Sequence, residues 1–164
     1  GGGRRIYAGV PLAGRVRRLM PPRPNWHALT LRVPGKLLAA IQTECRTSQA
    51  VAPGTPDDQR PSSCQFIALW DTGASGTVIS QSVVDQCGLK PVGMVKAHGV
   101  SGMYLAEQYL INLHLPNGVE FHQVVVTKGN MGVDVLIGMD IISAGDLSIT
   151  NHNGTTTFSF RVPS

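Results

Sequence analysis

Turn-forming residues divide this chain into short segments, and they constrain its fold more than any other feature. The turn signals are Pro34-Gly35, Pro116-Asn117-Gly118 and Asn151-His152-Asn153-Gly154. Asn and Gly favour such turns because they readily take positive φ angles. The apolar segments between turns predict strands at residues 26–33, 37–44, 66–70, 109–115, 119–126, 147–150 and 155–160. We therefore expect an all-β domain.

Two short helices are expected to interrupt the strands. Ser80 can cap a helix over residues 81–87 that ends at Gly88, and a second helix over residues 140–144 ends at Gly145. No apolar run approaches the roughly 20 residues that cross a bilayer, so no membrane span is expected in this chain.

The length of the chain limits what kind of enzyme it can be. Its 164 residues, 42% of them hydrophobic, fit one domain of ordinary size with a core. They leave no room for the two large lobes that many enzymes need. A second lobe would have to come from another chain.

Positive charge is concentrated at the N-terminus. Residues 1–60 hold ten Lys and Arg against three Asp and Glu, and residues 61–164 hold four against seven. We interpret residues 1–24, rich in Arg, Gly and Pro, as a flexible basic arm and residues 25–164 as the folded domain. The arm is either a solvated linker or leader, or a contact for nucleic acid or anionic lipid. A nucleic-acid-binding role ranks last among the functions considered.

Three cysteines are too few for a disulfide scaffold. Cys45 and Cys64 flank a polar loop, taken as residues 46–63, and would face each other at the mouth of a hairpin, either as a disulfide or as two thiols. Cys87, at the end of the first helix, is expected to be a small buried apolar group. No Cys or His spacing suggests a metal site, and neither a metal nor another cofactor is expected.

The segment around Asp71 carries the strongest chemical signal. The apolar residues 66–70 lead directly into Asp71-Thr72-Gly73-Ala74, after which apolar residues resume. Apolar flanks imply that Asp71 is at least partly buried, and burying an ionised carboxylate is costly unless it is paired or shares a proton. An Asp in an ordinary turn, accepting local backbone N–H groups, fits the tripeptide alone.

Three motifs together resemble those of the retropepsins, the retroviral and retroviral-like aspartic proteases. The first is Asp71-Thr72-Gly73-Ala74 after apolar residues. The second, residues 97–103, looks like the glycine-rich flap that closes over a bound peptide, and the third, residues 134–142, is similar to the apolar strand, Gly and short helix of the family. Gly138 would let this strand cross closely behind the Asp71 loop. The resemblance implies a closed, barrel-like acid-protease fold with a flap hairpin and one or two short helices.

The resemblance also implies an aspartic endopeptidase that acts on a peptide or protein substrate. Two carboxylates must share one proton, so that one activates a water and the other polarises the scissile carbonyl. The chain has one such turn, so a symmetric homodimer follows, active on the acidic side of neutrality. The catalytic residues implied are Asp71, Thr72 and Gly73; the substrate-binding residues are Ala74, Ser75, Val78, His98, Gly99, Val100, Ser101, Gly102 and Leu136.

Several positions depart from the viral pattern. Ser75 and Gly76 stand where many viral enzymes have acidic residues, Trp70 replaces a smaller aliphatic residue, and Met139-Asp140 replaces an Arg-Asn pair. Gly-Met-Asp forms occur in cellular and bacterial members, which are taken as the nearer relatives. A module of the same fold that dimerises and binds peptide without cutting it is the alternative function.

Overall fold

The computed structural model describes residues 25–35, 38 and 40–164. The arm expected at residues 1–24 lies outside the described residues. The strands are β1 (His27–Val33), β2 (Ile41–Gln49), β3 (Cys64–Trp70), β4 (Val78–Ile79), β5 (Gly93–Gly99), β6 (Gly102–His114), β7 (Glu120–Lys128), β8 (Val135–Ile137), β9 (Asp146–His152) and β10 (Thr155–Val162). The α-helices are α1 (Gln81–Cys87) and α2 (Met139–Ile142), and short 3-10 turns lie at Asp57–Gln59 and Pro116–Gly118. The all-β prediction is confirmed.

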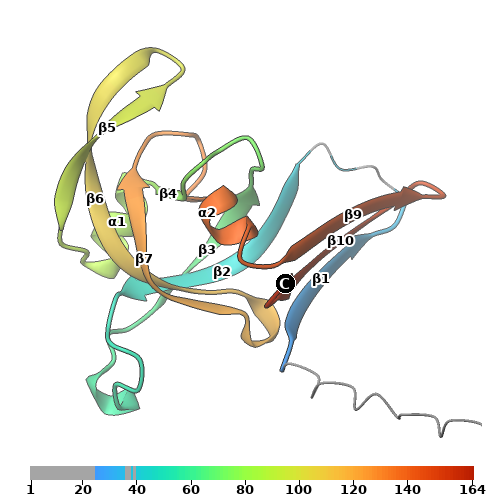
Figure 1. Cartoon of the computed structure of the whole chain (residues 1–164), viewed down its shortest axis with the longest axis horizontal. Helices are drawn as coiled ribbons and strands as arrows, with labels where there is room; N and C mark the ends of the chain where they lie inside the picture. Colours follow the sequence, from blue (N-terminus) through green and yellow to red (C-terminus); the bar gives the residue numbers. More distant parts are fainter. Residues whose placement is uncertain (1–24, 36–37, 39) are drawn as a thin grey trace, which may run out of the picture.

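The larger sheet closes on itself. Its strand order is β2-β3-β8-β4-β7-β6-β5, and β2 pairs with β6 as well as with β3. The strands from β2 to β6 therefore form a closed, barrel-like body, as Figure 1 shows. Closure satisfies the backbone groups of strands that would otherwise be sheet edges. Strand β5 lies outside this ring and pairs with β6 alone.

A smaller sheet of β1, β10 and β9 packs against the body. All its pairings are antiparallel. Alternate side chains of β10 point into the core, where Phe158 and Phe160 are fully buried. The ring of Trp70, at the end of β3, lies 4.9 Å from each of these two phenylalanine rings, measured between centroids. The indole of Trp70 also donates to Thr43 Oγ1 at 2.9 Å, so the unusual tryptophan joins the small sheet to the barrel.

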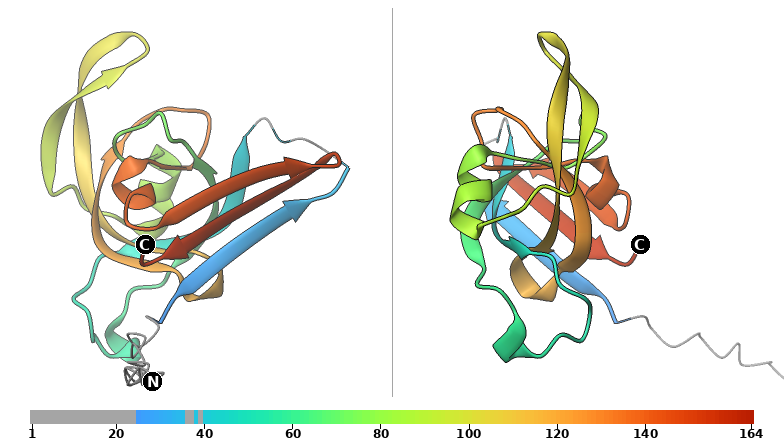
Figure 2. Two further views of the ribbon diagram at one scale, coloured as in Figure 1. Left: turned by 45° about the vertical axis from the view of Figure 1, so that its right-hand side comes forward. Right: turned by 90° about the vertical axis from the view of Figure 1, so that its left-hand side faces the viewer.

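The hairpin of β5 and β6 projects from the body (Figure 1, Figure 2). The two strands pair continuously from Gly93 with Gln108 to Gly99 with Gly102. Val100 at the tip is fully exposed. The small sheet extends on the opposite side of the body from this hairpin (Figure 1).

Local capping signals place the turns and helix α1. The Ser80 hydroxyl accepts a hydrogen bond from the backbone of Val83, and Gly88 ends the helix with a φ of 60°. Asn117 and Gly118 both have positive φ between β6 and β7, and Gly154 does so between β9 and β10. These predictions are confirmed.

The strand expected at residues 37–44 is shifted along the chain. Strand β2 runs over Ile41–Gln49, because Arg46 to Gln49 pair with β6 residues 111–114. Thr47 and Ser48 are buried there, although their polarity suggested a loop. The segment that joins β2 to β3 is therefore residues 50–63, shorter than the expected 46–63.

No helix in the described ranges has the length and apolar character needed to cross a membrane. Among the described residues, His, Cys, Asp and Glu form no group of three or more arranged to hold a metal ion.

Candidate active site

Strand β3 delivers Asp71 into a tight turn at the end of the parallel pair that β3 forms with β8. The backbone N–H of Asp71 donates to the carbonyl of Ile137 at 2.9 Å, which continues the pairing one residue beyond the strand. The N–H of Gly73 donates to Asp71 Oδ1 at 2.8 Å. The Asp71 side chain is half-buried and Oδ2 has no hydrogen-bond partner among the described residues. One carboxylate oxygen is thus oriented by the backbone and the other is free.

Gly138 packs directly against the Asp71 loop. A Cβ atom at position 138 would lie 2.6 Å from the carbonyl oxygen of Gly76 and 3.0 Å from that of Ala74. Only glycine avoids this clash, so the predicted close crossing behind the loop is confirmed. The N–H of Met139 donates to the Ala74 carbonyl at 2.8 Å, and that of Asp140 to the Ser75 carbonyl at 3.2 Å. The first residues of α2 therefore fix the backbone of the loop.

Asp140 and Thr77 form a second attachment that the sequence analysis missed. Asp140 Oδ2 accepts from the Thr77 N–H at 3.0 Å, and Oδ1 accepts from the Thr77 hydroxyl at 2.8 Å. The same hydroxyl accepts from the N–H of Gly138 at 3.2 Å. Thr77 is 1% exposed, so these contacts satisfy polar groups that water cannot reach. In the sequence, the only signals of this contact were a threonine within an apolar run and an aspartate at the start of a helix.

The predicted substrate-binding residues fall in two places. Ala74, Ser75 and Val78 follow Asp71, and Val78 pairs with Leu136 between β4 and β8. Leu136 is only 7% exposed, because it belongs to the barrel wall.

The other predicted substrate-binding residues form the hairpin tip, away from the body (Figure 1): His98, Gly99, Val100, Ser101 and Gly102. Gly102 has a φ of 113°, as the turn requires. A Cβ at Gly99 would lie 3.0 Å from the Tyr104 ring. His98 is exposed. Within one chain, Val100 is thus at the exposed tip and Leu136 is in the buried barrel wall.

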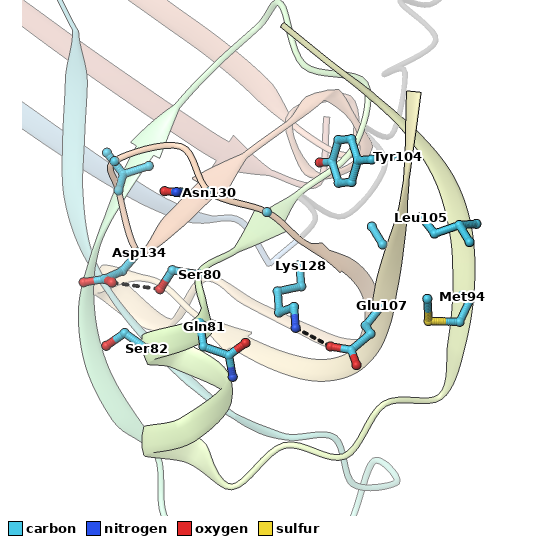
Figure 3. Close-up of a pocket in the computed structure, with 14 residues that line it drawn as sticks. Ser80, Gln81, Ser82, Met94, Tyr104, Leu105, Glu107, Lys128, Asn130 and Asp134 are labelled. Atoms are coloured by element: carbon cyan, nitrogen blue, oxygen red, sulfur yellow. Dashed lines mark hydrogen bonds and ion pairs between the residues drawn. The ribbon is translucent and has the colours of Figure 1, made fainter. Parts of the chain in front are cut away.

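A cavity of about 830 Å³ lies between the flap hairpin and the body. Figure 3 shows Met94, Leu105 and Glu107 of the flap strands on one side, with Ser80 and Asp134 on the other. None of the predicted substrate-binding residues lines it, and Asp71 is not in its wall. Its polar groups are instead supplied by β6, the start of α1, the end of β7 and the loop before β8, at positions that the sequence did not mark as functional.

Hydrogen bonds brace both walls of this cavity. Lys128 donates to Glu107 and forms an ion pair with it (Figure 3). The Tyr109 hydroxyl donates to the same carboxylate at 2.8 Å. These two hydrogen bonds, led by that of Lys128, lower the pKa of Glu107. The pKa of Tyr109 is raised to about 12, chiefly by burial and next by the hydrogen bond to Glu107. On the opposite wall Ser80 donates to Asp134 at 2.9 Å.

Residues 63–144 match the family model described as "gag-polyprotein putative aspartyl protease". No curated protein matches the sequence. The structure is similar to that of a retropepsin-like aspartic protease from Rickettsia conorii, with a TM-score of 0.50 and 9% identity, over 84% of this chain and 95% of that chain. At this identity the likeness concerns the fold, which is retropepsin-like.

Two further solved structures are less similar. The retroviral protease-like domain of Ddi1 from Leishmania major has a TM-score of 0.44 and 16% identity, over 68% of this chain and 82% of that chain. The protease of Simian Foamy Virus (mac) has a TM-score of 0.40 and 15% identity, over 63% of this chain and 92% of that chain.

Proposed function

The chain belongs to the gag-polyprotein aspartyl protease family, and on this premise we propose that it is an aspartic endopeptidase acting as a homodimer. The observation that carries the proposal is the Asp71 turn. One carboxylate oxygen accepts the Gly73 N–H at 2.8 Å, the other has no hydrogen-bond partner in the described part of the chain, and the turn backbone is held by β8 and α2. A rigid loop that presents half-buried Asp is what acid-base hydrolysis of a peptide bond needs.

Catalysis would require a second Asp71 from a twofold-related copy. Within the described residues, no other carboxylate hydrogen bonds to Asp71. Two such carboxylates brought together would share one proton, because both cannot ionise at close range. One would then act as general base on a water, while the protonated one donates to the scissile carbonyl oxygen. Thr72 and Gly73 are proposed to hold the two loops in register across the axis.

The flap hairpin is proposed to close over an extended peptide. Its tip, residues 98–102, is exposed, and a glycine at each end allows the turn and the close contact with Tyr104. The backbone N–H groups of such a tip can pair with the main chain of a peptide. Ala74, Ser75 and Val78 would contact the peptide from below, and Leu136 would lie behind them in the wall.

The test is digestion of a peptide library at several pH values and several enzyme concentrations. Asp71→Asn keeps the shape of the turn but removes the general base, so cleavage should fall to background. Asp58→Asn, at an exposed position of the connecting segment, is the matched control and should cleave at the parent rate. A rate that rises as the square of enzyme concentration at high dilution is expected for an active dimer.

Two outcomes would separate this function from the alternative, a module that binds peptide without cutting it. Asp71→Asn should still bind a statine-type inhibitor or an uncut peptide, although more weakly. If the parent protein binds peptide and cleaves nothing at any pH, the binding module is the correct function. If activity per chain does not change on dilution to concentrations at which the protein is monomeric, the shared active site is wrong.

A further inference from the structure

The end of α1 brings two cysteines together beside β2. Thr47 lies directly opposite Cys64 in the antiparallel pair of β2 and β3, and its hydroxyl is 3.2 Å from the sulfur of Cys87. From the other side, the Cys64 thiol donates to the carbonyl of Gln86, the residue before Cys87, at 3.3 Å. Burial raises the pKa of the Cys87 thiol, and the side chain of Cys64 raises it further. The two thiols are therefore neighbours.

The third cysteine, Cys45, is less accessible than this pair. Cys45 lies opposite Phe66, and Cys64 lies opposite Thr47. The two cysteines expected to face each other are therefore on the same face of the sheet but offset by two residues along the strands. Cys45 is 2% exposed, and burial raises its pKa to about 12. Almost none of it is thiolate near neutral pH, and thiolate is the reactive form. Cys64 and Cys87 are both partly exposed.

We propose that Cys64 and Cys87 form a reversible disulfide that closes a covalent ring around the Asp71 loop. The ring would span residues 64–87 and contain β3, the Asp71-Thr72-Gly73 turn, β4 and α1. All three cysteines are free thiols in the structure. The inference does not depend on the proposed proteolytic activity.

Oxidised glutathione is a sufficient oxidant. The thiolate of Cys64, whose sulfur lies at the surface, would attack one sulfur of oxidised glutathione and release one glutathione thiolate. The thiolate of Cys87 would then attack the Cys64 sulfur of this mixed disulfide and release the second glutathione. Two electrons pass from the protein to the oxidant, and the two thiol protons end on the two glutathiones.

The test is to incubate the folded protein with oxidised glutathione and count free thiols after denaturation. The count should fall from three to one. Peptide mapping should show a Cys64–Cys87 cross-link within one chain. Closing a loop of this length should raise the midpoint of thermal unfolding by about 5–10 °C, and reduction should reverse the rise.

Matched variants separate the pair from the third cysteine. Cys45→Ala should keep the cross-link, whereas Cys64→Ser and Cys87→Ser should each give only a mixed disulfide with glutathione and no rise in the midpoint. The thiol count on the parent protein needs no variant and guards against a misfolded mutant. Three remaining thiols, a cross-link that contains Cys45, or a disulfide between two chains on a non-reducing gel would each overturn the proposal.

Discussion

Replacing Asp140 by Ala should loosen the loop that carries Asp71. The carboxylate of Asp140 accepts both the N–H and the hydroxyl of Thr77, at 3.0 and 2.8 Å. Thr77 is 1% exposed, so both donors would lose their acceptor while Thr77 itself stays covered. A buried donor deprived of a charged acceptor costs about 1.5–3 kcal/mol. Because Asp140 itself is exposed and water can partly fill the gap, we expect a loss of about 2–3 kcal/mol.

The assay is urea unfolding followed by circular dichroism at neutral pH. A loss of this size should lower the thermal midpoint by about 5–10 °C as well. Asp140→Asn is the matched variant: its amide can accept from the Thr77 N–H and donate to the hydroxyl, so it should lose less than half as much. A double-mutant cycle with Thr77→Val should give a coupling of at least about 1 kcal/mol between the two positions.

Two results would refute this reasoning. Equal stability of Asp140→Ala and the parent would mean that the hydrogen bonds to Thr77 contribute nothing net. Equal losses in Asp140→Asn and Asp140→Ala would mean that charge, and not hydrogen bonding, holds the loop.

Three further changes probe other contacts. Gly138→Ala places a methyl group 2.6 Å from a backbone carbonyl oxygen and should cost about 3 kcal/mol in urea unfolding; an unchanged midpoint would show that the loop yields easily. Trp70→Leu removes the hydrogen bond to Thr43 and the contacts with the small sheet, so it should cost about 3 kcal/mol, and a calorimetric midpoint within 2 °C of the parent would contradict this. Glu107, whose pKa is lowered chiefly by Lys128, stabilises the fold above its ordinary pKa of 4.5 and loses this effect as pH falls through its lowered value. Between about pH 6 and about pH 3 the parent should therefore lose more thermal stability than Glu107→Gln; equal losses would argue against the ion pair.

Local signals in the sequence predicted the parts of the fold that local chemistry decides. Helix α1 begins at Ser80 and ends at Gly88 because a hydroxyl cap and a left-handed glycine act within one turn of chain. The hairpin at Asn117 follows from the backbone preference of that residue and the next. The closure of the barrel was not predictable in this way. Residues 46–49 are polar and read as a loop, and they become strand because they meet β6, more than 60 residues away.

In the candidate site, too, features set by local sequence were predictable and features set by long-range contacts were not. The Asp71 turn is a short motif, and its interpretation as an active site rested on the resemblance of three motifs together to the retropepsins. Gly138 was anticipated through the family resemblance, and the structure supplies the reason in the two carbonyl oxygens that face it. The link from Asp140 to Thr77 spans 63 positions and joins two common residue types, so no local pattern marks it. The cavity under the flap likewise depends on the distance between β6 and the loop before β8, which only the assembled barrel sets.

The contact at Gly138 is made to main-chain oxygens, whereas Ser75 and Gly76 are exposed to solvent. The contact therefore fixes the backbone path of the Asp71 loop but does not restrict which side chains stand at positions 75 and 76. Mutation could rewrite the chemistry presented at positions 75 and 76 while the carboxylate four residues earlier stays where it is. Substitutions at positions 75 and 76 can thus change substrate contacts during evolution while the packing that holds Asp71 is kept.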